Sequence, residues 1–218
     1  YREAGYLPAA LNNFLALLGW HPGSDEEIYS LEQMAALFEL EKVGKAGVRF
    51  DIEKANWYNQ EYLKAMSDEE LGRWLKEFLA SQNFELDFEG CCEIASMMKE
   101  RISFPAEMYT EAPFLYDDPK SYDEKIVGKR WNEEVVKVTT AFAEKISGWE
   151  SLSAEQAKAL LHEITEGLGI GVGKIMQAFR LSITGVGGGP DLMAIVEFLG
   201  PKTVIRRIEN AVRELPVV

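Results

Sequence analysis

Apolar residues recur at intervals of three and four along most of this chain, and this spacing constrains the fold more than any other feature. It places side chains on one face of an α-helix, whereas a half-buried strand alternates apolar and polar residues. Alternating stretches are almost absent. The clearest helical sets are Leu11, Phe14, Leu15 and Leu18; Leu31, Met34, Ala35 and Phe38; Leu71, Trp74, Leu75 and Phe78; Val135, Val138, Thr139 and Phe142; and Leu192, Ile195, Val196 and Leu199. We therefore predict a mainly α fold of multi-helix bundles.

Helix-start signals support this interpretation. In a capping box, a Ser and the Gln or Glu three residues later each bond the backbone N–H of the other residue. Asp51 is a predicted N-cap for a further helix, and residues 47–50 before it predict a short extended piece. The predicted capping boxes are Ser30 with Gln33, Ser67 with Glu70, and Ser153 with Gln156.

These patterns divide the chain into three segments. Residues 1–66 combine helices with the extended piece, so we expect a small mixed α/β region there. Residues 67–147 are predicted to form a first helical bundle with a proline-punctuated stretch. Residues 148–218 are predicted to form a second bundle, broken by glycine-rich loops.

Composition narrows the class of protein. A hydrophobic fraction of 47% suits a packed core. No apolar run approaches the ~20 residues needed to span a bilayer, so we expect no membrane partner. The adjacent Cys91 and Cys92 cannot form an ordinary disulfide, which fits a reducing, cytoplasmic location. No signal peptide is visible, and the chain begins with Tyr1, so we expect an internal piece of a longer protein.

Side chains suited to catalysis or metal binding are scarce. His21 and His162 have no Cys or His partner at metal-ligand spacing. The glycine-rich run 167–174 lacks the Gly of a phosphate-binding loop at position 168 and has no Ser or Thr after Lys174. The acidic clusters lie at turns and helix starts, where they favour the helix dipole. We therefore expect no catalytic residue, metal or cofactor in this chain.

The position of positive charge is more informative than its total. A net charge of -13 argues against a nucleic-acid partner, because such binders usually carry a basic surplus. Between Lys174 and Val218, however, six Lys and Arg residues outnumber four Asp and Glu residues, which gives +2 there and -15 elsewhere.

Within this less acidic end, Arg180 precedes a glycine-rich turn, after which a helix is predicted to start at Pro190. An Arg beside such a turn can stack on a base or bond its edge. The alternative is a solvated Arg on an ordinary connection between helices.

Three blocks of sequence carry a resemblance to a known family. Residues 1–20 read YREAGYLPAALNNFLALLGW, and residues 43–54 read VGKAGVRFDIEK, followed by WYN at 57–59. The third block runs from Arg180 to Met193, followed by LGPK at 199–202. In this order they resemble glutamyl-tRNA synthetases, which are class I enzymes, over nearly the whole chain. The class I signature motifs and the Rossmann-type ATP-binding half are absent from the sequence. The resemblance therefore implies a tRNA stem-contact region followed by two α-helical anticodon-binding subdomains.

The resemblance also implies which residues contact tRNA. In the family, an Arg at the position of Arg180 and the loop containing Gly189, Pro190, Leu192 and Met193 lie at the anticodon. The family often has Thr and Phe where this chain has Gly189 and Met193. These two residues cannot supply the side-chain hydrogen bond of the Thr or the aromatic stack of the Phe. A Met can still cover a base face through its polarizable sulfur.

Further cations are implied as contacts. Arg101 aligns with an anticodon-reading Arg associated with a preference for tRNA-Glu over tRNA-Gln. The other interpretation of Arg101 is a structural Arg on the helical face of Ile94. The predicted contacts to tRNA phosphates, which position without specifying, are Lys45, Lys54, Lys174 and Lys202.

The resemblance implies a full enzyme that attaches glutamate to tRNA-Glu, with ATP and Mg held by a catalytic domain that this chain lacks. The chain alone is then inactive, and we expect a cytoplasmic monomer that binds tRNA-Glu and not DNA. The rival hypothesis is a helical protein-interaction module with no RNA role, which would use its acidic surface and aromatic stripes.

Overall fold

The fold is almost entirely helical. The computed structural model describes residues 1–218 and contains eleven α-helices and two short 3-10 helices. The only β pairing is an isolated bridge between Trp20 and Val43. The predicted mainly α class is confirmed. This bridge is the whole β content of the mixed region predicted for residues 1–66, and residues 47–50 pair with no other strand. No helix combines the length and the apolar character needed to cross a bilayer.

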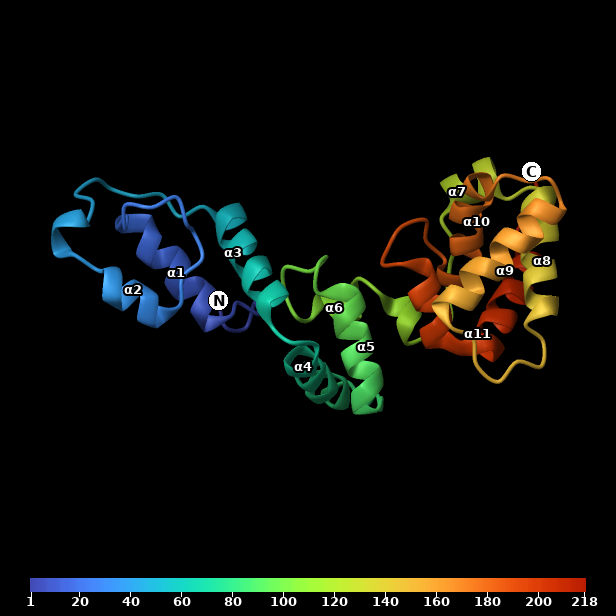
Figure 1. Cartoon of the computed structure of the whole chain (residues 1–218), viewed down its shortest axis with the longest axis horizontal. Coiled ribbons are helices and arrows are strands. Elements are labelled where there is room, and N and C mark those ends of the chain that lie inside the picture. The colour runs from blue at the N-terminus through green and yellow to red at the C-terminus, as the bar shows by residue number, and fades with distance from the viewer. The chain divides into compact units, whose positions relative to one another are not determined.

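The chain divides into two compact units, Tyr1–Glu111 and Ala112–Val218. In the first unit α1 packs against α3, and α4 pairs with α5 (Figure 1). A Cβ at Gly72 of α4 would lie 2.6 Å from the Cys92 sulfur of α5, so glycine permits this close helix pair. The helices of this unit are α1 (Pro8–Gly19), α2 (Leu31–Leu37), η1 (Leu40–Lys42), α3 (Ile52–Ala65), α4 (Asp68–Ser81), α5 (Phe88–Met98) and α6 (Glu107–Thr110).

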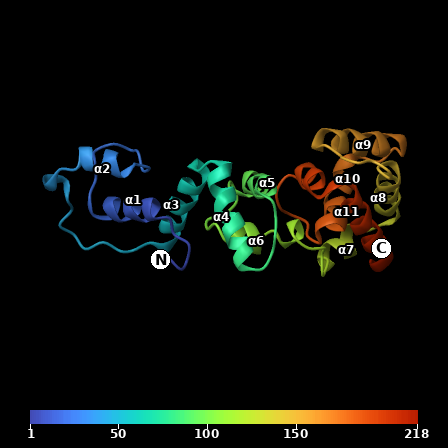
Figure 2. The ribbon, with the colours of Figure 1, turned by 90° about the horizontal axis from the view of Figure 1, so that it is seen from below.

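In the second unit, α8, α9, α10 and α11 pack around one core, and α7 covers α10 (Figure 2). The rings of Phe142 and Phe179 meet edge to face in this core, 4.9 Å apart. Gly200, with φ 71°, breaks α11 before Pro201. The helices are η2 (Pro113–Leu115), α7 (Glu124–Arg130), α8 (Glu133–Lys145), α9 (Ala154–Gly167), α10 (Val172–Thr184) and α11 (Leu192–Glu214).

The boundary between the units falls inside the predicted segment 67–147. Helix α8 belongs to this segment, yet it packs against α9, α10 and α11, because its buried face carries Val135, Val138 and Phe142. The finer division into 1–66, 67–147 and 148–218 stays a prediction.

Local helix signals agree closely with the structure. All three predicted capping boxes form, and the Asp51 carboxylate accepts from the Glu53 and Lys54 N–H groups. One prediction is wrong: no helix starts at Pro190. Asp191 caps α11 instead, because its carboxylate accepts from the Met193 and Ala194 N–H groups.

A buried amide joins three parts of the first unit. Asn59 of α3 accepts a hydrogen bond from the Leu7 N–H at 2.7 Å, just before α1. Its Nδ2 donates to the Ser103 carbonyl at 2.5 Å, in the segment after α5. The second sequence block that resembles the synthetase family ends at this residue, and the structure gives it a role in holding the fold.

Replacing Asn59 by Ala is expected to lower the free energy of unfolding of the first unit by about 2–3 kcal/mol. The substitution leaves the partly buried Leu7 N–H and Ser103 carbonyl without partners, and a group of this kind costs about 1–3 kcal/mol when it is left unpaired. Urea unfolding followed by circular dichroism measures the loss. Gln60→Ala is the matched control, since its only side-chain bond is long, at 3.4 Å. Equal stability of the two variants would contradict this role for Asn59.

Candidate nucleic-acid interface

Five of the six residues predicted at the anticodon come together in the second unit, all except Arg101. Arg180 lies in the C-terminal half of α10, and the other four lie at or just before the start of α11. Arg180, Leu192 and Met193 line a pocket of about 400 Å³ between α9, α10 and the start of α11. The pocket is also lined by Ala154, Glu155, Lys158, Leu161, His162, Met176 and Asp191.

The Arg180 side chain fixes the loop that leads into α11. Its Nη2 donates to the Pro190 carbonyl at 2.8 Å. A Cβ at Gly189 would lie 3.3 Å from Arg180 Nη1, so the loop backbone approaches the guanidinium closely. Gly189 has φ +137°, a conformation that favours glycine. The resemblance implies a Thr at this position. Gly189 instead brings its backbone, and no hydroxyl, close to Arg180.

The apolar part of the pocket comes from side chains that are almost fully buried. Leu192 and Met193 expose only 3% and 6% of their surface. Their packing supports the floor of the pocket, and a base would meet only a small part of either side chain. The polar groups of the wall come from α9, where Lys158 and His162 are both exposed.

The glycine-rich turn after α10 is held against the preceding chain. Gly185 ends α10 with φ 78°, and its carbonyl accepts from the Asp123 N–H at 2.9 Å. A Cβ at Gly185 would lie 2.5 Å from the Ser121 carbonyl oxygen. A Cβ at Gly187 would overlap the Ile126 side chain of α7. Small residues are thus required here for packing, and the turn is seated on α7.

Arg207 clamps the segment that precedes α7. Its buried guanidinium donates from Nη1 to the carbonyls of Phe114 at 2.7 Å and Ile183 at 3.0 Å. Nη2 donates to the Asp117 carbonyl at 2.8 Å, and Nε to the Asp118 carboxylate at 2.9 Å. The Phe114 ring reaches to 3.5 Å from the place of a Gly189 Cβ. Arg207 therefore supports the loop of the candidate site from beneath.

Asp118 is the carboxylate at the centre of this cluster. Arg206 binds it through two N–H groups, each at 2.8 Å, while Arg207 adds a third bond. Hydrogen bonding from Arg206 is the main cause that lowers the pKa of Asp118 below its ordinary value, with Arg207 adding to it against the effect of burial. Burial lowers the pKa of Arg207, and the Asp118 carboxylate opposes this shift.

The predicted Arg101 belongs to the first unit. It is exposed in a turn, and its backbone N–H donates to the Met98 carbonyl at 2.8 Å. The alternative that anchors Arg101 on the helical face of Ile94 is wrong, since α5 ends at Met98.

The predicted phosphate contacts have different surroundings. Lys45 is exposed in an irregular stretch of the first unit. Lys54 forms an ion pair with Glu27 at 2.7 Å, so its charge is compensated within the protein. Lys174 is exposed in the first turn of α10, and Lys202 is exposed after the break in α11.

Sequence reasoning missed Lys158, His162 and the Arg207 clamp. Lys158 and His162 are four residues apart and so share a face of α9, but only the packing of α9 against α10 brings that face to Arg180. Arg207 resembles any surface Arg in the sequence. The one available signal was its place between Val204 and Ile208, both buried, on a helix with an apolar face.

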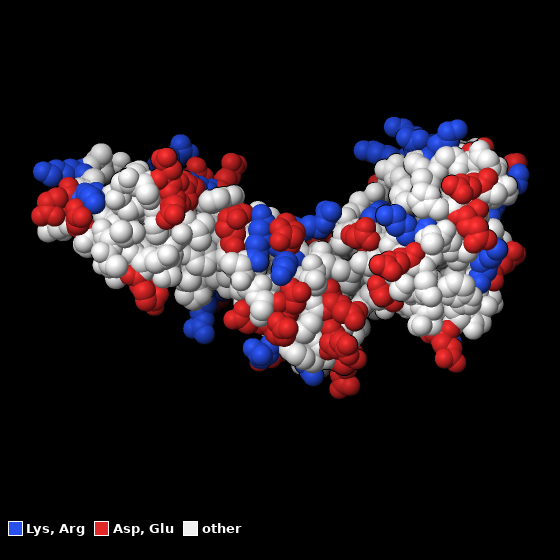
Figure 3. All heavy atoms as spheres, in the orientation of Figure 1, with Lys and Arg blue, Asp and Glu red and all other residues white.

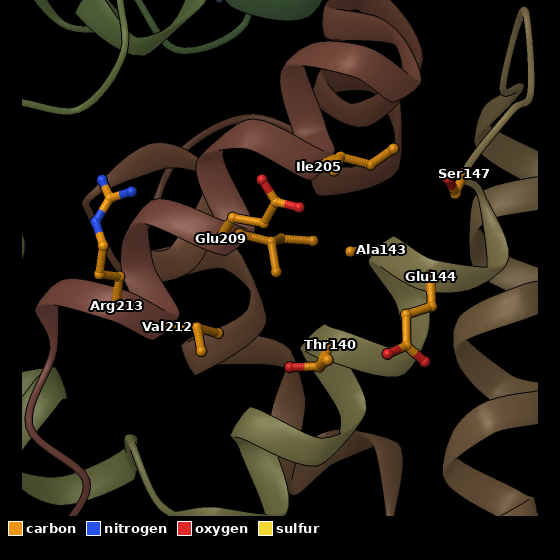
Figure 4. Close-up of a pocket in the computed structure, with 9 residues that line it drawn as sticks. Thr140, Ala143, Glu144, Ser147, Ile205, Glu209, Val212 and Arg213 are labelled. Carbon is orange, nitrogen blue, oxygen red and sulfur yellow. The ribbon is translucent and has the colours of Figure 1, made fainter.

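A second pocket of about 350 Å³ lies between α8 and the end of α11 (Figure 4). Its wall combines the apolar Ala143, Ile205 and Val212 with Glu144 and Glu209. It contains no His, Cys or Lys, and none of the predicted site residues reaches it.

Comparisons with known proteins agree with this geometry. The family model described as an anticodon binding domain matches residues 51–212, most of the chain and all of the Arg180 pocket. The chain belongs to the anticodon-binding domain family. Residues 1–57 match a second model, described as the catalytic domain of class I tRNA synthetases (E and Q). Only this short piece of the chain matches the catalytic domain, in agreement with the expectation that the chain lacks that domain.

The relatives of this anticodon-binding chain are synthetases. It is 40% identical over 212 residues to the glutamate–tRNA ligase of Cytophaga hutchinsonii, covering 97% of the chain and 41% of the relative. It is 41% identical over 216 residues to that of Bacteroides thetaiotaomicron, covering 99% and 43%. The chain thus spans about two-fifths of the length of these relatives.

Solved structures show the same fold. A glutamate–tRNA ligase from Elizabethkingia meningosepticum, crystallised in complex with its amino acid, matches with a TM-score of 0.94 and 40% identity, over 99% of this chain and 43% of that one. The synthetase from Elizabethkingia anophelis matches with a TM-score of 0.89 and 40% identity, over 98% and 42%. The resemblance to glutamyl-tRNA synthetases that the sequence indicates is confirmed.

Proposed function

We propose that this chain is the tRNA-binding portion of a glutamate–tRNA ligase and that its second unit reads the anticodon of tRNA-Glu. The observation that carries this proposal is the Arg180 pocket. Its lining includes Arg180, Leu192 and Met193, which the resemblance implies as anticodon contacts, and the chain belongs to the anticodon-binding family. Anticodon bases are unpaired, so they can be splayed out and read at their edges by an Arg. Lys158 at the same pocket offers a point charge for a nearby phosphate.

The wider protein follows from the same proposal. It attaches glutamate to tRNA-Glu with ATP and Mg in a catalytic domain of which this chain holds only a short piece, so the chain alone has no ligase activity and needs no cofactor. We further propose that it acts as a cytoplasmic monomer. The family match favours this function over a helical protein-interaction module without an RNA role.

The test is binding of unmodified transcripts to the 218-residue chain. Affinity for tRNA-Glu is expected to exceed that for tRNA-Glu with a replaced anticodon by at least about tenfold, since each well-formed base contact discriminates by about 1–3 kcal/mol. Affinity should also fall steeply as salt rises. Fluorescence anisotropy at salt concentrations from about 50 to about 200 mM measures both effects.

Two results would reject parts of the proposal. Equal affinities for tRNA-Glu with its own and with a replaced anticodon would reject anticodon reading. An affinity that does not change with salt would favour the protein-interaction module instead. Arg101→Gln belongs in the same comparison with tRNA-Gln added. If Arg101 selects against tRNA-Gln, this variant lowers the ratio of the affinities for tRNA-Glu and tRNA-Gln. An unchanged ratio would show that Arg101 is not part of the site.

A further inference from the structure

The second unit carries an exposed group of cations that no prediction from sequence singled out. Lys125, Lys129 and Arg130 all lie on the short helix α7, and all three are exposed. Figure 3 shows Lys and Arg atoms gathered at the upper edge of this unit, over the place of α7 in Figure 1. We call these three residues the α7 cationic patch.

The charges of this patch are not compensated by neighbouring carboxylates. Lys120 and Lys137, the next cations on either side along the chain, pair with Asp117 and Glu133. The three patch residues have no carboxylate oxygen within 4.0 Å. Two acidic residues lie at the start of α7. Asp123 uses its carboxylate to cap the helix by accepting from the Lys125 and Ile126 N–H groups. Glu124 is exposed in the first turn and forms no ion pair with the patch.

The stability of α7 explains only part of the patch. Lys129 and Arg130 lie in the last turn, where the helix dipole favours positive charge. Lys125 lies in the first turn, where the dipole disfavours it, and it is four residues before Lys129, so the two like charges repel each other. A helix whose cations served only its own stability would not place one at Lys125.

The patch borders the candidate base pocket through one short loop. Ile126 of α7 packs on Gly187, and Gly189 lies against the Arg180 guanidinium. Two residues of chain span at most about 7 Å. The same loop is held to the start of α7 by the hydrogen bond from the Asp123 N–H to the Gly185 carbonyl. A polynucleotide with a base at Arg180 therefore has α7 within reach of its neighbouring backbone.

We propose that the α7 cationic patch binds phosphates of the anticodon arm of tRNA while the Arg180 pocket receives a base. This inference rests on the proposed function and adds the surface that orients the RNA. The Lys ammonium groups act as point charges, and the Arg guanidinium can hold a phosphate through two N–H groups. In a chain with a net charge of -13, a local patch of this kind directs RNA to one face while the remaining surface repels it.

The test removes the patch and follows the salt dependence of tRNA-Glu binding. The variant carries Lys125→Gln, Lys129→Gln and Arg130→Gln, which keep the helical propensity high. Each lost phosphate contact lowers the slope of log K against log salt by about 0.7–0.9, so the expected loss for three contacts is about 2–3. The ratio of affinities for tRNA-Glu and for the replaced anticodon should stay unchanged, because phosphate contacts position and do not specify.

The matched control removes three other cations of the same unit through Lys120→Gln, Lys137→Gln and Lys145→Gln. It changes the net charge equally, and its salt slope is expected to stay at the wild-type value. A Lys125→Arg, Lys129→Arg variant should also keep the wild-type slope. If the patch variant and the control lose equal slope, the patch has no specific role and the proposed function stands. If the wild-type chain does not bind tRNA at all, the proposed function fails, and this inference fails with it.

Discussion

Replacing Arg180 by Ala is expected to weaken binding of tRNA-Glu to this chain by about 10- to 100-fold. The guanidinium both lines the pocket and bonds the Pro190 carbonyl, so the substitution removes a base contact and loosens the loop that shapes the site. A well-formed Arg–base pairing is worth about 1–3 kcal/mol, and loss of the loop contact adds to this. Fluorescence anisotropy with the unmodified transcript measures the change.

Two further variants separate these effects. Arg180→Lys can still reach the Pro190 carbonyl, but it lacks the planar pair of N–H groups that recognises a base edge. It should therefore keep the thermal stability of the wild type and still lose affinity and discrimination against the replaced anticodon. Lys137→Ala removes an exposed cation of the same unit that is not among the predicted tRNA contacts, and it serves as the control. Affinity for tRNA-Glu that survives Arg180→Ala would show that its role has been assigned wrongly.

Replacing Arg207 by Met is expected to lower the free energy of unfolding of the second unit by about 3–5 kcal/mol. Three carbonyls and one carboxylate accept hydrogen bonds from this buried side chain, and removing one partner of a buried charged cluster leaves the others uncompensated. Hydrogen exchange followed by mass spectrometry, with urea as denaturant, reports on each unit separately. Protection should fall throughout residues 112–218 and stay unchanged in residues 1–111.

The neighbouring Arg206 supplies the control for this prediction. Its side chain is more than half exposed, and a surface ion pair contributes about 0–1 kcal/mol, so Arg206→Met should cost far less than Arg207→Met. Because the pKa of Asp118 is lowered, its carboxylate stabilises the folded state above the ordinary carboxyl pKa, and this contribution is lost as pH falls through the lowered value. Equal loss of stability in the two Met variants would contradict the clamp.

The helices of this protein were predictable because their signals are local. Ser30, Ser67 and Ser153 each bond a backbone group three residues away, so a short window of sequence contains the whole interaction. The candidate site residues on α10 and at the start of α11 could be named from the sequence for a similar reason, since residues 180–193 are contiguous and one block carries their resemblance to the family. The start of α11 was misplaced by two residues, because both Pro190 and Asp191 are good helix-start residues and only the backbone bonds distinguish them.

Charge was the property least predictable from the sequence. The segment from Lys174 to Val218 counts as +2, yet two of its cations, Arg206 and Arg207, are bound by Asp118, which lies outside that segment. Three exposed cations without an ion pair, Lys125, Lys129 and Arg130, lie instead on α7, in a part of the chain whose net charge is negative. A count along a window cannot include a partner that is 88 residues away.

The amino-acid sequence by itself determined the helical class, the helix starts and the family, because helix periodicity, capping and motif identity all depend on neighbours within a few residues. The tertiary structure alone decided that α9 completes the Arg180 pocket, that Arg207 is a buried clamp and that α7 adjoins the glycine-rich loop. These outcomes depend on which distant faces pack together, and burial and charge compensation follow from that packing.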